Sequence, residues 1–262
     1  MKTVVISGAS RGIGLCLAEI FVKDGCKVYN LSRTPASTEG VINIKTDVSD
    51  EEAVKAAFEQ IKSESESVDL VFANAGYGIS GAIEFTDTAD AKRQFDVNFF
   101  GVLNVVKAAM PLLRESRGRI IATSSVAAVF PIPFQSFYSA SKSSVTMLMS
   151  ALANETRRFG VSACSVLLGD TETGFTDARV KSSAGDDIYS GAISKSVAVM
   201  ERDEQNGASK EKVAAKIAKI AKKRRVKNKY VVGLSYKLLT FLDKILPAGV
   251  VNRLVGMIYM PK

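Results

Sequence analysis

Short apolar runs alternate with longer segments of helical periodicity along most of the chain. The runs are rich in β-branched residues and predict strands at 3–7, 27–32, 41–46, 68–73, 119–124, 162–168 and 230–233. Apolar residues recur at helical spacing over about 12–23, 50–61, 89–113, 137–159 and 209–225. Strands that alternate with helices of this length predict right-handed βαβ units and a doubly wound parallel sheet of about seven strands.

The bulk composition is that of an ordinary soluble protein. Of the 262 residues, 47% are apolar and 24% are charged, as is typical of a globular domain. The first residues lack the apolar core of a signal peptide, and no stretch is apolar over the length of a spanning helix, so a cytoplasmic protein is expected. With no repeat and no linker-like composition, residues 1–235 are predicted to form one domain.

Histidine is absent and cysteine is scarce, which removes several kinds of active site. Without histidine the chain has no Ser-His-Asp triad, no Cys-His pair and almost none of the zinc-hydrolase designs. The three cysteines, Cys16, Cys26 and Cys164, fit no metal-binding spacing, so reduced thiols and no metal site are expected.

The net charge of +8 is concentrated in one segment. Residues 210–229 carry ten basic residues and one acidic residue, a local net charge of +9 that leaves the rest of the chain at −1. A nucleic-acid-binding domain would spread basic residues over its body, so no nucleic-acid partner is expected.

A glycine-rich turn follows the first predicted strand and leads directly into the first predicted helix. Gly8, Gly12 and Gly14 have the spacing G-x-x-x-G-x-G. Glycine permits a sharp turn and a close approach of phosphate to a helix N-terminus, where free N–H groups and the helix dipole favour negative charge. The position of the turn therefore predicts a dinucleotide-binding loop.

This loop and several later motifs together resemble the short-chain dehydrogenase/reductase family. Residues 7–14 resemble its T-G-x-x-x-G-x-G signature, with Ser7 in place of threonine. The pair Asp47-Val48 resembles the one that holds the adenine ring, and residues 73–76 (Ala-Asn-Ala-Gly) resemble the N-N-A-G strand end. The likeness covers about residues 1–175 and implies a Rossmann domain, a nicotinamide cofactor and a homo-oligomer, either a dimer or a tetramer.

The end of the second predicted strand bears on which dinucleotide binds. It has the sequence Ser32-Arg33-Thr34, nineteen residues past Gly14, where NAD-binding folds commonly have a carboxylate for the ribose 2′-hydroxyl. Arg33, together with Arg11 of the glycine loop, can pair with a 2′-phosphate instead, which predicts NADP(H). With the resemblance, the predicted cofactor site comprises Gly8, Ser10, Arg11, Gly12, Ile13, Gly14, Ser32, Arg33, Asp47, Val48, Asn74, Ala75, Gly76, Tyr138, Lys142, Gly169, Thr171 and Thr173.

Four residues match the family's catalytic tetrad: Asn98, Ser125, Tyr138 and Lys142. Tyr138 and Lys142 stand one helical turn apart, so the ammonium is expected to lower the pKa of the phenol from its usual value of about 10. Ser125 ends an apolar strand and is expected to hydrogen-bond the substrate oxygen. By resemblance, Lys142 also holds the nicotinamide ribose, and Asn98 anchors a water that links Lys142 to solvent.

The segment 126–137 is strongly apolar and contains two prolines. A site lined by it, with Tyr77, Phe175 and the Met147/Met149 pair as further candidates, suits a lipophilic alcohol or ketone. A hydroxysteroid is the leading prediction, and a long-chain acyl ketone, another carbonyl substrate or a retinoid-like molecule are alternatives. A non-catalytic protein that senses NADP(H) is the alternative of another class, and the complete tetrad argues against it.

Two later segments complete the predicted site. In residues 169–173 (Gly-Asp-Thr-Glu-Thr) the proline that the family usually carries before the glycine is missing, so the shape of this loop stays open. Residues 174–208, rich in Ser, Gly and Asp, are predicted to be a mobile substrate lid.

The chain ends in an amphipathic extension, residues 236–262, in which apolar clusters alternate with charged residues and Pro247 interrupts the pattern. Three interpretations stay open. The extension is a flap over the substrate pocket, a subunit contact, or part of a peripheral membrane contact through residues 222–260 that the basic run assists.

Overall fold

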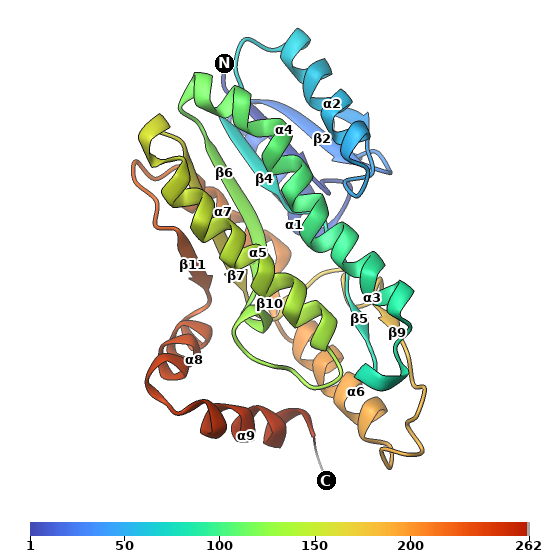
Figure 1. Ribbon diagram of the computed structural model, residues 1–262. Helices are drawn as coiled ribbons and strands as arrows, with labels where there is room; N and C mark the ends of the chain where they lie inside the picture. The colour runs from blue at the N-terminus through green and yellow to red at the C-terminus, as the bar shows by residue number, and fades with distance from the viewer. Residues whose placement is uncertain (261–262) are drawn as a thin grey trace.

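A seven-stranded parallel sheet forms the centre of the computed structural model, which describes residues 1–260 (Figure 1). Its strand order is β11-β7-β6-β4-β1-β2-β3. The strand bounds are β1 (Thr3–Ser7), β2 (Lys27–Ser32), β3 (Val41–Lys45), β4 (Leu70–Ala73), β6 (Arg119–Ser125), β7 (Ser162–Leu168) and β11 (Lys229–Val232). The predicted doubly wound α/β fold is confirmed, and its strand order reverses between β1 and β4, where such sheets bind their ligands.

Helices cover both faces of the sheet, which explains why its strands are apolar runs and not alternating ones. One face is covered by α2 (Glu51–Glu64), α4 (Gly101–Ser116) and α5 (Ser136–Glu155), and the other by α1 (Gly12–Lys23) and α7 (Lys210–Ala221). Successive residues of β1 show the two cores. Val5 is buried in the first core, whereas Val4 and Ile6 are buried in the second.

The predicted helix 89–113 is divided by a π-helical turn. α3 (Thr88–Phe95) continues through η2 (Asp96–Phe100) into α4. Such π-helical turns re-aim side chains and are frequent at functional sites. Within the described residues, Thr88–Ser116 is also the one helical stretch with the length and hydropathy for crossing a membrane, but 56% of its apolar window is buried inside the domain. It therefore serves as a core helix.

The prediction that the seventh helix runs to Arg225 is wrong, because α7 ends at Ala221. The guanidinium of Arg119, at the start of β6, donates hydrogen bonds to the carbonyl oxygens of Ala221 and Lys223. These bonds satisfy acceptors that a longer helix would use internally. The basic run therefore lies in the connection between α7 and β11.

The segment predicted as a lid, residues 174–208, is joined to the domain by short strand pairs. β8 (Thr171–Glu172) pairs with β10 (Ala208–Ser209), and β9 (Val180–Lys181) pairs with β5 (Ile79–Ser80). Between them lies α6 (Ala192–Gln205). The remaining short turns are η1 (Ile83–Phe85), η3 (Val126–Ala128) and η4 (Arg157–Phe159).

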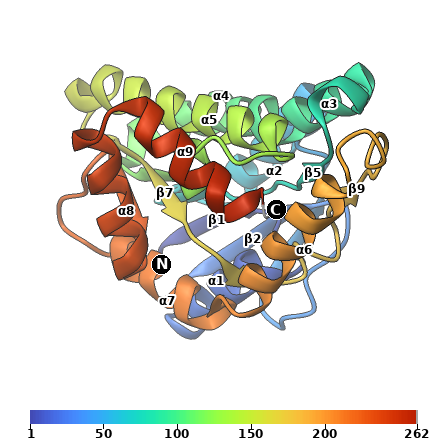
Figure 2. The same cartoon turned by 90° about the horizontal axis from the view of Figure 1, so that it is seen from below.

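The described part of the C-terminal extension forms two helices, α8 (Leu234–Ile245) and α9 (Ala248–Tyr259), separated at Pro247, and residues 261–262 of the predicted extension lie outside the described residues. They lie beyond the carboxyl ends of the strands (Figure 1). Seen from below, α9 crosses in front of this edge of the sheet, with α5 on one side and α6 on the other (Figure 2). The extension is thus part of the wall around the site.

Candidate active site

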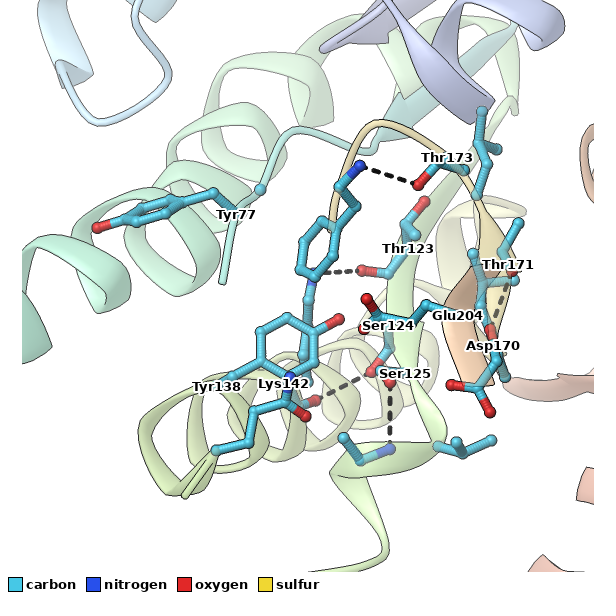
Figure 3. A pocket seen from close by; sticks show the side chains of 18 of the residues that line it. Tyr77, Thr123, Ser124, Ser125, Tyr138, Lys142, Asp170, Thr171, Thr173 and Glu204 are labelled. Carbon is cyan, nitrogen blue, oxygen red and sulfur yellow. Dashed lines mark hydrogen bonds between the residues drawn. The ribbon is translucent and has the colours of Figure 1, made fainter. Parts of the chain in front are cut away.

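A cavity of about 710 Å³ opens at the carboxyl ends of β1, β4, β6 and β7 (Figure 3). Every residue of the predicted cofactor and catalytic sets lines it except Gly14 and Asn98. Figure 3 shows Tyr138 and Lys142 on one side of the cavity and Thr171 on the other, with Ser125 between them. Its position at the sheet's switch point is the one expected for a dinucleotide.

In the glycine loop between β1 and α1, a side chain in place of a glycine would collide with the neighbouring backbone. Gly8 has a φ of +75°, and a Cβ there would lie 2.9 Å from the Cα of Ala75. A Cβ on Gly14 would lie 2.2 Å from the carbonyl oxygen of Gly8, so Gly14 acts by packing and not by touching the cavity. No side chain among residues 1–260 caps the first turn of α1. Its N–H groups therefore fit a dinucleotide phosphate.

Buried polar side chains hold this loop in place. The Ser7 hydroxyl accepts hydrogen bonds from the backbone N–H groups of Asn74 and Ala75, at 3.0 and 3.2 Å. The Asn30 side-chain oxygen accepts from the Ala9 N–H at 3.0 Å and from the Ser32 hydroxyl at 2.6 Å. Asn30 is absent from the predicted site, although an asparagine inside an apolar strand is the signal of such a bond.

The rim of the cofactor side carries two exposed arginines, Arg11 and Arg33. Asp47 lies on the same rim and accepts hydrogen bonds from the backbone and hydroxyl of Ser49. Partial burial acts to raise the pKa of Asp47, but the Ser49 hydrogen bonds and the Arg33 charge outweigh it and leave the pKa below its usual range. The rim thus combines positive charge with one ionised carboxylate.

Asn98 lies in the π-helical turn and is fully buried behind the cavity wall. Its amide nitrogen donates to the Tyr77 carbonyl oxygen at 2.9 Å and to the Ser141 hydroxyl at 3.1 Å. Its side-chain oxygen accepts from the Tyr77 N–H at 3.0 Å. Asn98 therefore fixes the chain that follows β4 against α5, and it is a positioning residue in this structure.

The Tyr138 and Ser125 hydroxyls lie close to each other in the cavity wall. Burial raises the pKa of Tyr138 to about 12, and the hydrogen bond with Ser125 opposes this rise. The expected lowering of this pKa by a neighbouring ammonium is therefore not found. A phenol with a raised pKa is fully protonated at neutral pH, which is the form that donates a proton.

The surroundings of Lys142 show why the expected lowering of the Tyr138 pKa is not found. It is only 4% exposed, its Nζ donates to the Thr123 carbonyl oxygen at 3.0 Å, and it lies 5.8 Å from the centre of the Tyr138 ring. Burial lowers its pKa to about 8. Desolvation is thus the largest cause of both shifts.

Comparison with known proteins assigns this arrangement to a family. A model of the short chain dehydrogenase family matches residues 2–184. The chain is a short-chain dehydrogenase. As a member of that family it is an oxidoreductase, and its cofactor is a nicotinamide dinucleotide.

Two curated relatives and one solved structure resemble this short-chain dehydrogenase over most of its length. It is 39% identical to a 3-ketodihydrosphingosine reductase of Bacteroides thetaiotaomicron over 223 residues, which cover 84% of this chain and 83% of the relative. It is 31% identical to the probable short-chain type dehydrogenase/reductase VdlC of Helicobacter pylori, with 94% and 93% covered. A short-chain dehydrogenase from Streptomyces avermitilis has the same fold, with a TM-score of 0.82 at 25% identity over 93% of each chain.

The loop after β7 of this short-chain dehydrogenase is held by the C-terminal extension. The Tyr236 ring of α8 packs on Gly169, where a Cβ would lie 2.0 Å from a ring carbon. The Tyr236 hydroxyl donates to the Asp170 carboxylate at 2.5 Å and accepts from the Asp170 N–H at 3.1 Å. Because residue 169 is a glycine, the Tyr236 ring has room to pack there. The Tyr236 hydroxyl in turn holds the Asp170 carboxylate in place.

Three carboxyl groups line the cavity away from the cofactor rim: Asp170, Glu204 and, on the C-terminal extension, Asp243. Glu204 is paired with the buried guanidinium of Arg179 and accepts a hydrogen bond from the Thr176 hydroxyl at 2.6 Å. No lysine or arginine of residues 1–260 forms an ion pair with Asp170. Burial raises the pKa of Asp170, and the charge of Glu204 adds to this rise against the Tyr236 hydrogen bond. An added cation would stabilise its ionised form.

The rest of the substrate side is apolar. The predicted segment contributes Val126, Phe130 and Ile132, and Phe175 packs against Tyr138 with ring centres 5.5 Å apart. The two methionines lie elsewhere, since Met149 is in the core and Met147 is 73% exposed on α5. The C-terminal extension also contributes to the cavity wall, through residues that could not be predicted one by one from the sequence. These residues are Tyr236, Leu239, Leu242, Asp243, Leu246, Val251, Leu254, Val255, Ile258 and Tyr259.

Proposed function

We propose that this short-chain dehydrogenase uses NADPH to reduce a long-chain amino ketone of the 3-ketodihydrosphingosine kind. The observation that carries the proposal is the composition of the cavity, in which the Tyr138 hydroxyl shares an apolar wall with the carboxyl groups of Asp170 and Glu204. The relative from Bacteroides thetaiotaomicron, named for that ketone, supports the same substrate class. A hydroxysteroid becomes the second candidate, because it is lipophilic but has no amine to pair with a carboxylate.

In the proposed reaction the chain's own residues orient the ketone and supply its proton. The Ser125 and Tyr138 hydroxyls hydrogen-bond the carbonyl oxygen, and Tyr138 Oη transfers its proton as negative charge develops there. Bound NADPH supplies the hydride. Lys142, held by the Thr123 carbonyl oxygen, keeps a positive charge beside the phenol and would hydrogen-bond the nicotinamide ribose of the bound cofactor. Asn98 fixes the backbone that borders these groups.

The preference for NADPH is proposed from the rim at the end of β2. Arg11 and Arg33 provide two guanidinium groups for a 2′-phosphate. Ser32 ends β2 without a carboxylate, and its hydroxyl already donates to Asn30. The nearest acid on the rim, Asp47, is engaged by Ser49, at the position that the family uses for the adenine ring.

The amine of the substrate is assigned to Asp170. In a 2-amino-3-ketone the ammonium lies one carbon from the reacting carbonyl, so its partner must line the same part of the cavity as Tyr138. Asp170 lines that cavity, and its charge acts on the Tyr138 hydroxyl. Glu204 already has Arg179 as its partner. Of the two other carboxylates on this side of the cavity, Asp170 and Asp243, Asp170 is the one whose charge acts on the Tyr138 hydroxyl.

Asp170→Asn is therefore expected to lower kcat/KM for 3-ketodihydrosphingosine by about tenfold, the effect of losing one charged hydrogen bond. A ketone of equal chain length without the amine should lose much less. The measurement is NADPH oxidation with both ketones. Asp203→Asn on α6 is the matched control, because Asp203 pairs with Arg202 and does not line the cavity. Equal losses with the two ketones would contradict amine recognition.

The pH dependence of NADPH use reports on Lys142. Its ammonium form is present below a pH of about 8 and is lost as the pH rises through that value. Because the proposed role of Lys142 needs its charge, kcat/KM for NADPH should fall by about tenfold per pH unit above this point. Tyr138 does not titrate in this range. In Lys142→Arg the falling limb should disappear, and a profile of the native enzyme that stays flat well beyond this pH would contradict the assignment.

A substrate screen tests the proposed function as a whole. NADPH oxidation would be followed by the absorbance of the reduced nicotinamide, with 3-ketodihydrosphingosine, hydroxysteroid ketones, retinoids, simple acyl ketones and sugars in parallel. The highest kcat/KM is expected for the long-chain amino ketone. A preference for a steroid would overturn the proposed substrate, and NADPH binding with no turnover of any ketone would favour a sensing protein.

A further inference from the structure

The helices α8 and α9 expose apolar side chains on the outer surface of the molecule. The outward residues recur at spacings of three and four, which places them in one stripe on each helix. Their exposed fractions lie between 44% and 84%. The stripe residues are Leu234, Leu238, Phe241 and Ile245 on α8, and Val250, Leu254 and Met257 on α9. An apolar surface of this extent is unusual for a face that meets only water.

Positive charge borders the stripes. Lys237 and Lys244 on α8 and Arg253 on α9 lie beside them. The single acid of the two helices, Asp243, lines the cavity and so points inward. Long basic side chains beside an outward apolar stripe are the pattern of helices that lie in the interface of an anionic bilayer.

The cavity opens onto the same face. Leu239, Leu254 and Ile258 line the cavity and are also 46%, 48% and 56% exposed. These residues therefore belong both to the inner wall and to the outer surface. An apolar chain leaving the cavity between them would remain in contact with apolar side chains.

We propose that α8 and α9 dock this enzyme on the surface of an anionic lipid bilayer, with the mouth of the cavity against the lipid. The attachment itself is independent of the reaction, whereas entry of a long-chain substrate from the bilayer rests on the proposed function. The apolar stripes lie among the acyl chains near the surface, and Lys237, Lys244 and Arg253 contact the lipid phosphates.

A second copy of the chain fits this face less well. A two-fold contact would bring the same patch from both copies together. That patch carries three cations, and among its described residues no outward carboxylate is available to pair with them. Anionic headgroups, in contrast, complement both its charge and its apolar stripe.

The basic run 222–229 is not part of this docking face. Residues 222–228 precede β11 and Lys229 is its first residue, whereas α8 follows β11, so the length of that strand separates the two regions. Figure 1 shows the connection between α7 and β11 at the opposite end of the sheet from α8 and α9. The docking face can therefore be tested separately from the basic run.

The test is co-sedimentation of the full chain with vesicles, without cofactor or substrate. Vesicles of phosphatidylcholine alone are compared with vesicles that contain a quarter phosphatidylglycerol, at low and high salt. We expect at least about a tenfold larger bound fraction on the anionic vesicles at low salt, and a marked loss at high salt. No binding of the native chain to anionic vesicles at low salt would overturn the proposal.

Variants locate the binding surface. The double variant Leu238→Glu with Phe241→Glu changes two outward residues that do not line the cavity, and it should lose most vesicle binding. Met147→Glu, a single change from an apolar residue to glutamate at an exposed site on α5, should bind as the native chain does. The charge variant Lys223→Glu with Arg224→Glu should also retain binding. Loss only in this last variant would overturn the proposal in favour of the basic run.

Two further measurements separate lipid binding from unfolding and from self-association. Circular dichroism and thermal unfolding of each variant show whether a loss of binding is a loss of folding. Sedimentation velocity without vesicles tests self-association, and a native dimer that the α8 double variant dissociates, with no vesicle binding by either, would assign the face to a second copy. Because vesicle binding needs no turnover, a failure in the substrate screen would leave this result unaffected.

Discussion

Replacing Tyr138 with phenylalanine is expected to lower kcat for ketone reduction by about 10²- to 10⁴-fold, the range for loss of a positioned proton donor. The substitution removes one oxygen and keeps the ring that packs on Phe175 with centres 5.5 Å apart. It also removes the interaction of the Tyr138 hydroxyl with Ser125, so the free energy of unfolding should change by no more than about 1.5 kcal/mol. The measurement is steady-state NADPH oxidation with the best substrate of the screen.

The control for this prediction is cofactor binding. Lys142 keeps its bond to the Thr123 carbonyl oxygen without the Tyr138 hydroxyl, so the Kd for NADPH should change by less than about threefold. A Tyr138→Phe enzyme with kcat within about tenfold of the native value would show that another group supplies the proton. A large loss of NADPH affinity would instead show that the variant disturbs the cofactor site.

The raised pKa of Tyr138 also predicts which direction of the reaction is favoured. A phenol with a pKa of about 12 is present at neutral pH almost wholly in the protonated form, which can donate a proton, and hardly at all as the phenolate that would accept one. Ketone reduction should therefore be favoured over alcohol oxidation near neutrality. The spacing of Tyr138 and Lys142 predicts the opposite shift, because spacing reveals neighbours but not how deeply both groups are buried.

The fold could be predicted because each strand and each helix is indicated by the pattern of its own short segment of sequence. Each strand of the sheet is buried on both faces and so appears as an apolar run, and each helix shows its own periodicity. The sequence-based predictions are wrong where a contact between residues far apart in the chain determines the structure. Arg119 binds carbonyl oxygens about a hundred positions later and ends α7 at Ala221, and no pattern within 209–225 carries that contact.

The candidate site likewise has one part that short local motifs predict and another that depends on contacts between distant residues. The glycine loop and the four tetrad positions are short motifs at ordered places along the chain, and the structure brings them to one cavity or, for Asn98 and Gly14, directly behind it. The Asp170–Tyr236 pair joins residues 66 positions apart. Its only local signal was the missing proline before Gly169, which marks a changed loop but not the partner that fills the space.

Replacing Arg33 with aspartate is expected to reverse the discrimination between the two nicotinamide cofactors. A hydrogen bond to a charged group contributes about 1.5–3 kcal/mol, so losing the pairing with a 2′-phosphate lowers kcat/KM for NADPH by about 10- to 150-fold. The new carboxylate repels the phosphate and can accept hydrogen bonds from an unphosphorylated ribose. The ratio of kcat/KM for NADPH to that for NADH should therefore fall by about a hundredfold or more.

Two variants separate charge from position in this experiment. Arg158→Asp makes the same change in an exposed residue that does not line the cavity, and it should leave the ratio unchanged. Arg11→Ala should lower the NADPH value alone and by less, because Arg11 is the second of the two guanidinium groups on the rim and no carboxylate is added. If Arg33→Asp leaves the ratio as it was, the 2′-phosphate does not reach the end of β2. The preference for NADPH would then have to come from Arg11 at the start of α1, on the other side of the same rim.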